Sequence, residues 1–272
     1  MRKAGKPDPR GRLALYHALL LAALFALWYG LTTPGLVSEE FAKYTAFFFG
    51  RPVQVLKVTW EWFASGKIYP HLGITLLETL LAFVVGSVLG LGVGLWLALA
   101  HTASVLADPY IKAMNAMPRV ILAPIFAVWF GLGIVSKVAL GVTLVFFIVF
   151  FNVYQGVKEV SPTVLANARM LGASRRQLLR HLYLPSATSW VFSSLHTSVG
   201  MAFVGAVVGE YLGSAKGVGY LILQAEGVFD INSVFAGILV LTACALLLDV
   251  IVTRVEARLL VWRPKTAETE VP

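Results

Sequence analysis

Several ionisable side chains lie inside or beside long apolar stretches of this sequence. Glu78, His196 and Asp249 stand within such stretches, and Glu210 follows another. A charge is unfavourable in hydrocarbon, so an ionisable residue at that depth marks a candidate functional position. We treat these four as candidate pathway or gate residues for a polar solute. The structural alternative is that Glu78 and Asp249 pair with a neighbouring helix or reach water near the ends of their stretches.

Glycines follow Glu210 closely, in the segment Gly217-Val218-Gly219-Tyr220-Leu221. Two interpretations of this segment are open. In the first, Gly217 and Gly219 belong to a loop that closes an outer gate or receives a partner protein. In the second, they only permit a tight turn before a short re-entrant apolar stretch at 220–223.

The residue types of catalytic and metal centres are present but not arranged as such centres require. The 5 histidines and the single cysteine are scattered, without the spacing of metal ligands. No nucleophile stands beside a base. The phosphate-binding string G-x-x-x-x-G-K-S/T does not occur. We therefore expect no catalytic residue, no metal and no cofactor in this chain, which would not be an enzyme.

The composition indicates that these residues are positioned by membrane helices. Of the 272 residues, 58% are hydrophobic and 13% are charged, whereas soluble domains carry about 25% charge. An ordinary soluble enzyme is excluded. Six apolar segments reach the length of about 20 residues that a bilayer requires. They lie at 13–31, 72–100, 105–131, 136–155, 187–209 and 233–253.

We predict an all-α membrane protein with six transmembrane helices, because backbone groups in hydrocarbon must pair within their own segment. We expect the first segment to be retained as a membrane anchor and not cleaved as a signal peptide. The third begins with polar residues, which predicts a broken or tilted helix there. Those residues are Asp108, Lys112, Asn115, Pro118 and Arg119. In the second segment Gly86, Gly90 and Gly94 predict a close helix contact, within one subunit rather than across a dimer.

The positions of Lys and Arg predict the topology. Basic residues concentrate in the tails 1–12 and 254–272 and in the loop 156–186. Loops rich in Lys and Arg stay in the cytoplasm, so we expect both termini there. The loop 32–71 is then external. It contains a predicted amphipathic helix with Val53, Leu56, Trp60 and Phe63 on one face, which either lies on the outer leaflet or covers the end of the bundle.

The cytoplasmic loop has the strongest local signals. Ser161 and Pro162 predict a helix start, and Gly172 predicts its end. Ser174 and Gln177 fit a capping box that begins a second helix, which we expect Pro185 to end. The result is a two-helix elbow. Its basic second helix suggests DNA binding, but membrane spans hold it at both ends, so we expect no nucleic acid. The other interpretations are a loop that neutralises lipid headgroups and an apolar anchor for a soluble partner.

This loop resembles the EAA loop of ATP-binding-cassette (ABC) importer permeases. The resemblance rests on Ala166-Asn167-Ala168, Gly172 and Leu182-Tyr183-Leu184-Pro185. The string Arg169-Met170-Leu171-Gly172-Ala173-Ser174 is similar to the version found in the nitrate, sulfonate and taurine branch. Pro118, Ala123-Pro124, the run 129–133 and Glu210 with 217–221 extend it over residues 50–262. Ala166 stands where the family has Glu, and Asn167 stands where the family has its first Ala. Docking of this loop onto a partner protein would therefore rest on shape and apolar contact rather than on an ion pair.

The resemblance implies a MetI-like ABC importer permease fold in the bacterial inner (plasma) membrane. It implies three partners: an ATPase dimer that holds ATP and Mg²⁺, a second permease copy, and an extracytoplasmic solute-binding protein. We expect the two permease copies to form a homodimer. The residues assigned to ATPase coupling are Leu165, Ala166, Asn167, Ala168, Arg169, Leu171, Gly172, Leu184 and Pro185.

The expected solute is a small anion such as a sulfonate, taurine or nitrate. The alternatives are a pyrimidine or vitamin precursor or an aromatic acid carried by the same mechanism. A stand-alone secondary carrier is the competing class. Such carriers show inverted repeats and charges midway through the membrane, and the sequence indicates neither.

Overall fold

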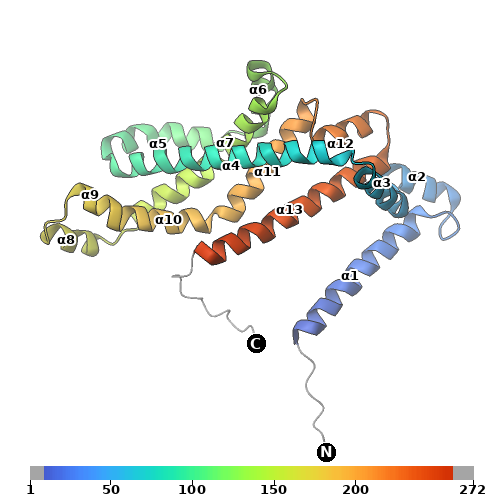
Figure 1. Cartoon of the computed structure of the whole chain (residues 1–272), viewed down its shortest axis with the longest axis horizontal. Coiled ribbons are helices and arrows are strands. Elements are labelled where there is room, and N and C mark those ends of the chain that lie inside the picture. The colour runs from blue at the N-terminus through green and yellow to red at the C-terminus, as the bar shows by residue number, and fades with distance from the viewer. Residues whose placement is uncertain (1–8, 260–272) are drawn as a thin grey trace, which may run out of the picture. The chain divides into compact units, whose positions relative to one another are not determined.

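The computed structural model describes residues 9–259, which form helices joined by turns (Figure 1). Among these residues no strand occurs, and one isolated bridge joins Pro34 and Val37. The predicted tails fall partly outside this range, at 1–8 and 260–272. In chain order the elements are α1 Pro9–Thr32, α2 Glu39–Phe49, α3 Pro52–Ala64, α4 Ile68–Leu99, α5 His101–Ala116, η1 Arg119–Ile121, α6 Leu122–Phe130, α7 Ile134–Lys158, α8 Pro162–Met170, α9 Arg175–Leu178, η2 Leu179–Tyr183, α10 Leu184–Ser193, α11 Leu195–Leu212, α12 Val218–Gly227 and α13 Ile231–Leu259.

Four of these helices, α1, α4, α7 and α13, are long and apolar enough to cross a membrane by themselves. Two bent pairs bring the number to six if each pair is one span, namely Thr102–Ala116 with Arg119–Phe130 and Arg175–Phe192 with His196–Leu212. The described helices therefore agree with the six predicted spans. Several extend past the predicted limits, since α1 starts at Pro9, α4 at Ile68 and α13 continues to Leu259. Polar flanks continue a helix as readily as apolar residues do.

The third span is broken, as predicted. Its two halves meet at an angle of 78°. Met117 and Pro118 between them have extended backbone, with ψ values of 132° and 97°. Proline has no N–H to donate and disfavours the helical conformation of the residue before it, so α5 ends here.

The prediction that a helix ends at Pro185 was wrong. Helical backbone runs from α9 through the π-helical η2 into α10, where Pro185 occupies the first turn. In η2 the Leu184 N–H donates to the Leu179 carbonyl, five residues back. This wider turn accommodates the proline because the usual bond to the residue four back is not needed.

The chain divides into two compact units, and each is described by itself. The first comprises Met1–Ile68 and Leu221–Val240. Within it, α2 was not predicted. This helix is tied to α1 by the Thr45 hydroxyl, which donates to the Leu31 carbonyl over 2.5 Å.

Helix α3 is the predicted amphipathic helix. Its apolar face is exposed, with Trp60 73% accessible, so this face does not cover the bundle within the unit.

The second unit comprises Tyr69–Tyr220 and Leu241–Pro272. Here α4 and α7 pack closely through the three predicted glycines. An added Cβ at Gly86 would lie 2.7 Å from the Val145 side chain, and one at Gly94 would lie 3.0 Å from that of Val153. The predicted contact within one subunit is confirmed for this face.

We expect Gly90→Val to destabilise the protein by about 1–3 kcal/mol, because overpacking displaces well-packed neighbours. A Cβ at Gly90 would lie 2.8 Å from the Phe146 carbonyl oxygen. Gly92→Val is the matched control, since nothing lies within 4 Å of a Cβ at that position of the same helix. Thermal unfolding of the two variants in detergent measures the difference, and equal melting temperatures would contradict the packing.

Candidate functional site

The two-helix elbow of the loop 156–186 begins with α8, a short helix with well-defined ends. Ser161 occupies the N-cap position without a side-chain cap hydrogen bond, and Pro162 is the first helical residue. At the other end Gly172 has a φ of +79°. The Gly172 N–H donates to the Arg169 carbonyl and the Ala173 N–H to the Ala168 carbonyl, both over 3.0 Å. This is a Schellman motif, which fixes the direction of the chain after α8.

The second half of the elbow starts where predicted. Ser174 and Gln177 form a reciprocal capping box, with the Ser174 N–H donating to Gln177 Oε1 over 2.8 Å. The Ser186 hydroxyl in α10 donates to the Gly156 carbonyl in α7 over 2.5 Å. A Cβ at Gly156 would lie 2.6 Å from the Trp190 ring, so the two helices touch. The second half of the elbow is therefore continuous with α10, and α10 is fixed to α7.

The elbow lies at the end of the second unit where α4 also ends (Figure 1), and several of its apolar side chains are exposed. Leu171 is 88% accessible and Met170 79%, and Val164 is also exposed. Leu165 and Ala168 are half-buried, whereas Ala166, Asn167 and Arg169 face out. Leu184 is half-buried and Pro185 exposed in α10. The exposed apolar residues of the short helix form a surface suited to a partner.

A second cluster surrounds Glu210 near the end of α11. The Glu210 side chain is fully buried. Its Oε1 accepts a hydrogen bond from the Thr75 hydroxyl over 2.6 Å, and its Oε2 accepts one from the Gly219 N–H over 2.8 Å. The Val218 N–H in turn donates to the Thr75 hydroxyl oxygen over 3.1 Å. One carboxylate thus holds the start of α12 against α4 and α11.

Gly217 and Gly219 are required by this close approach. Gly217 has a φ of +115°, and an added Cβ would lie 2.1 Å from the Glu210 carboxyl carbon. At Gly219 it would lie 2.6 Å from the Val207 carbonyl oxygen. The Gly217 N–H also donates to His71 Nδ1 over 3.1 Å. The tight turn is confirmed, and its glycines allow the backbone to reach the buried carboxylate.

Two further ionisable groups lie beside this cluster. Glu78 and Lys137 are each 1% accessible. Lys137 Nζ donates to the carbonyls of Leu132 and Gly133, the latter over 3.0 Å. Lys137 lies within electrostatic reach of both Glu78 and Glu210. A buried lysine is stabilised by acidic neighbours of this kind.

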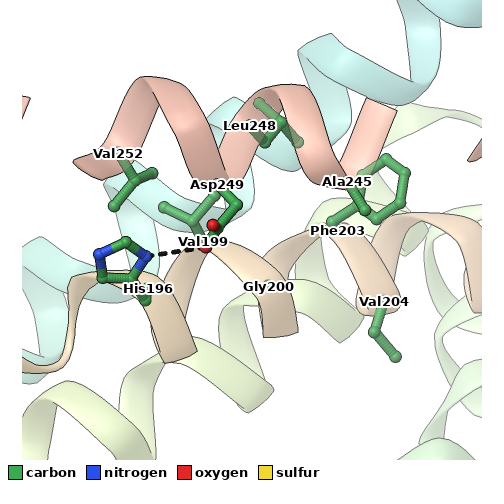
Figure 2. A pocket seen from close by; sticks show the side chains of 9 residues that line it. All are labelled: His196, Val199, Gly200, Phe203, Val204, Ala245, Leu248, Asp249 and Val252. Carbon is green, nitrogen blue, oxygen red and sulfur yellow. Dashed lines mark hydrogen bonds and ion pairs between the residues drawn. The ribbon is translucent and has the colours of Figure 1, made fainter. Parts of the chain in front are cut away.

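A separate cluster joins His196 of α11 to two carboxylates of α13. His196 Nδ1 lies 2.9 Å from Asp249 Oδ1, and Nε2 lies 2.9 Å from Glu256 Oε2. Ionised carboxylates only accept, so both contacts are hydrogen bonds when the imidazole carries two protons. Figure 2 shows His196 and Asp249 at the edge of an otherwise largely apolar pocket of about 270 Å³ between the two helices.

We expect this cluster to couple α11 to α13 energetically. His196→Leu leaves the two carboxylates without their cation, and Glu256→Gln removes one of them. The variant with both substitutions should lose less free energy of unfolding than the two single variants lose together, by on the order of 1 kcal/mol. Thermal unfolding of the four proteins gives this interaction energy. His17→Leu, at an exposed histidine of α1, is the control, and additive effects would argue against the cluster.

The structure separates the candidate pathway residues into two groups. Glu78, Glu210, Gly217 and Gly219 lie together. His196 lies at the other end of α11, about 20 Å from Glu210 along the helix axis, and contacts Asp249 of α13 there. The sequence analysis missed Thr75, Lys137 and Glu256. Lys137 carried a usable signal, because it stands in the first turn of a long apolar span.

Comparison with known proteins gives concordant results. The sequence profile of the family described as binding-protein-dependent transport system inner membrane component matches residues 86–261. The chain is 32% identical to a Bacillus subtilis permease protein, SsuC, whose name assigns it to aliphatic sulfonates transport, over 95% of this chain and 91% of SsuC. It is 33% identical to the formylaminopyrimidine transport permease protein ThiX of Halalkalibacterium halodurans, over 79% and 85% of the two chains. A chain of the inward-facing MetNI methionine ABC transporter superposes with a TM-score of 0.57 at 19% identity, covering 68% of this chain and 92% of that one.

Proposed function

Because the chain belongs to the family of binding-protein-dependent transport system inner membrane components, we propose that its α8 transmits the work of a separate ATPase to the membrane spans. The chain is the transmembrane permease subunit of an ABC importer, a multi-pass membrane protein with a helical permease fold. The proposal concerns its partners, its coupling and its solute.

The observation that carries the proposal is the combination of rigidity and exposure in α8. The helix has defined ends and is joined to α7 through residues 159–161, and it is followed by the continuous helical run from α9 through η2 into α10, which a hydrogen bond ties to α7. Its apolar side chains Leu171 and Met170 are nevertheless exposed. A short rigid helix with an apolar end fits a groove on a soluble partner, because burying that surface favours docking.

The mechanism follows from these connections. ATP binding closes the two ATPase subunits and displaces the docked α8. Because α8 leads directly into α7 and, through α9 and η2, into α10, the displacement reaches two spans as a rigid movement. We propose that this movement switches the solute pathway between inward-open and outward-open states. Two copies of the permease, forming a homodimer, surround this pathway. The ATP and Mg²⁺ sites belong to the ATPase, and the membrane is the bacterial inner membrane.

The solute that we propose is a small anion of the sulfonate, taurine or nitrate type, delivered by an extracytoplasmic solute-binding protein. The name of SsuC supports this class. A pyrimidine or vitamin precursor is the second candidate, and the name of ThiX favours it. Native mass spectrometry of the binding protein distinguishes the two, since a bound sulfonate and a bound pyrimidine differ in mass.

The proposal is tested by co-expression of the permease with its ATPase and its solute-binding protein. We expect the ATPase to co-purify with the permease, and we expect liposomes containing the complex to accumulate solute only with ATP and binding protein. Uptake by the permease alone, without ATP, would contradict the proposal and would favour a secondary carrier.

A further inference from the structure

The break in the third span places a guanidinium midway along the span. Arg119 directly follows the bend between α5 and α6, near the centre of the bent pair that runs from Thr102 to Phe130. An ionisable residue at that depth is a candidate site by virtue of its position, because it is retained there against an unfavourable transfer free energy.

The contacts of Arg119 orient its side chain but do not neutralise it. Its Nη2 donates to Asn115 Oδ1 over 2.5 Å and to the Asn115 carbonyl over 3.2 Å. Its Cζ lies 4.5 Å from the ring centroid of Phe147, a buried residue of α7. The guanidinium therefore rests on an aromatic face with one end held by an amide.

Two features show that these contacts leave part of the guanidinium without a partner and its charge without an acidic partner among the described residues. The buried Nε of Arg119 has no hydrogen-bond partner among the described residues. Within residues 9–259, the acidic groups that form ion pairs do so with other cations, and none of these pairs involves Arg119. The nearest cation along α5, Lys112, is paired with Asp108 over 2.6 Å. Arg119 thus differs from Lys112 and from Lys137, which have acidic neighbours.

We propose that Arg119 and Asn115 form an oxyanion site midway through the permease that binds the sulfonate or carboxylate group of the transported solute. This inference rests on the proposed function and deepens it. A guanidinium presents a fork of donors that matches two oxygens of such a group. Because Asn115 Oδ1 accepts from Arg119, the amide N–H groups of Asn115 are the donors that remain on that side chain. Met114 and Ile121 are exposed close by in the chain and suit the carbon part of a small organic anion.

With the bent pair crossing the membrane as one span, a lipid phosphate is not the occupant that this position favours, because phosphates lie at the membrane surface and Arg119 lies midway along the pair. The anion bound here is expected to be small and to pass through. Weak binding is sufficient, since a transport site must release what it binds.

The test is anion binding to the purified permease–ATPase complex without nucleotide. Sodium ethanesulfonate is the probe and neutral dimethyl sulfone its uncharged counterpart, and thermal unfolding in detergent is the readout. We expect ethanesulfonate to raise the melting temperature of the wild type in a saturable manner and dimethyl sulfone to have no such effect. In Arg119→Gln the apparent affinity should fall about tenfold or more, as expected for loss of a charged hydrogen-bond donor.

Lys112→Gln is the matched control, because it also removes one cation from the same span and should keep the wild-type response. General salt effects appear equally in all proteins and cancel. Should Arg119→Gln fail to assemble with the ATPase, Arg119→Lys decides, since it keeps the charge but loses the fork and should bind more weakly. Equal responses of wild type and the Arg119 variant, or no saturable response of the wild type, would overturn the site. Co-purification and ATP-driven uptake test the proposed function separately, so a negative result here leaves that function intact.

Discussion

Replacing Leu171 with glutamate is expected to abolish ATP-driven uptake while the permease itself stays folded. Leu171 is 88% accessible, so its side chain makes little contribution within the chain. In the docked complex we propose that it is buried, where a leucine contributes about 1.5–3 kcal/mol. Glutamate loses this contribution and places a charge in an apolar contact, which is further unfavourable. The ATPase should no longer co-purify with the variant.

Two further variants make this experiment decisive. Leu171→Met keeps an apolar side chain of similar volume and should retain co-purification and uptake. Leu36→Glu introduces the same charge at another exposed leucine, 65% accessible, in the predicted external loop, and should have little effect on the ATPase. The melting temperature of the permease should be the same for all of these proteins. Wild-type uptake by Leu171→Glu would mean that this end of α8 does not dock.

Replacing Glu210 with alanine is expected to destabilise the permease strongly. The substitution removes the acceptor of the Thr75 hydroxyl and of the Gly219 N–H, and an unsatisfied buried donor is unfavourable by about 1–3 kcal/mol. It also takes one carboxylate away from Lys137, which is buried. Glu210→Gln should be intermediate, because an amide keeps the volume and one acceptor oxygen but turns an N–H toward one of the two donors.

Thermal unfolding in detergent and proteolysis of the turn at 213–217 measure this effect. We expect the melting temperature to fall in the order wild type, Gln, Ala, and the turn to become accessible to protease in the alanine variant. Thr75→Val should destabilise the Glu210→Ala variant less than it destabilises the wild type, since both substitutions remove the Thr75–Glu210 hydrogen bond and only the loss of the acceptor for the Val218 N–H is added. Glu40→Ala, at an exposed carboxylate of α2, is the control. An unchanged melting temperature for Glu210→Ala would show that the carboxylate does not hold the turn.

Local features of the fold were predictable because neighbouring residues decide them. Gly172 ends α8, the capping box of Ser174 and Gln177 starts α9, and Pro118 breaks the third span, as the sequence indicated. The same reasoning failed at Pro185, because a π turn one step earlier removed the conflict that a proline creates inside a regular helix. It also missed α2, whose residues combine charged and aromatic side chains without a long apolar run.

The sequence by itself determined the helical class, the elbow and the glycine face of α4, since each follows from the length or spacing of residues along one segment. Only the tertiary structure decided which charges meet. Thr75 and Glu210 are separated by 135 residues, and His196 and Glu256 by 60. Arg119 and Phe147 likewise come from different helices. Such pairs form because packed helices bring distant segments side by side at one depth, and hydrophobic periodicity within a segment says which face is apolar but not which neighbour covers it.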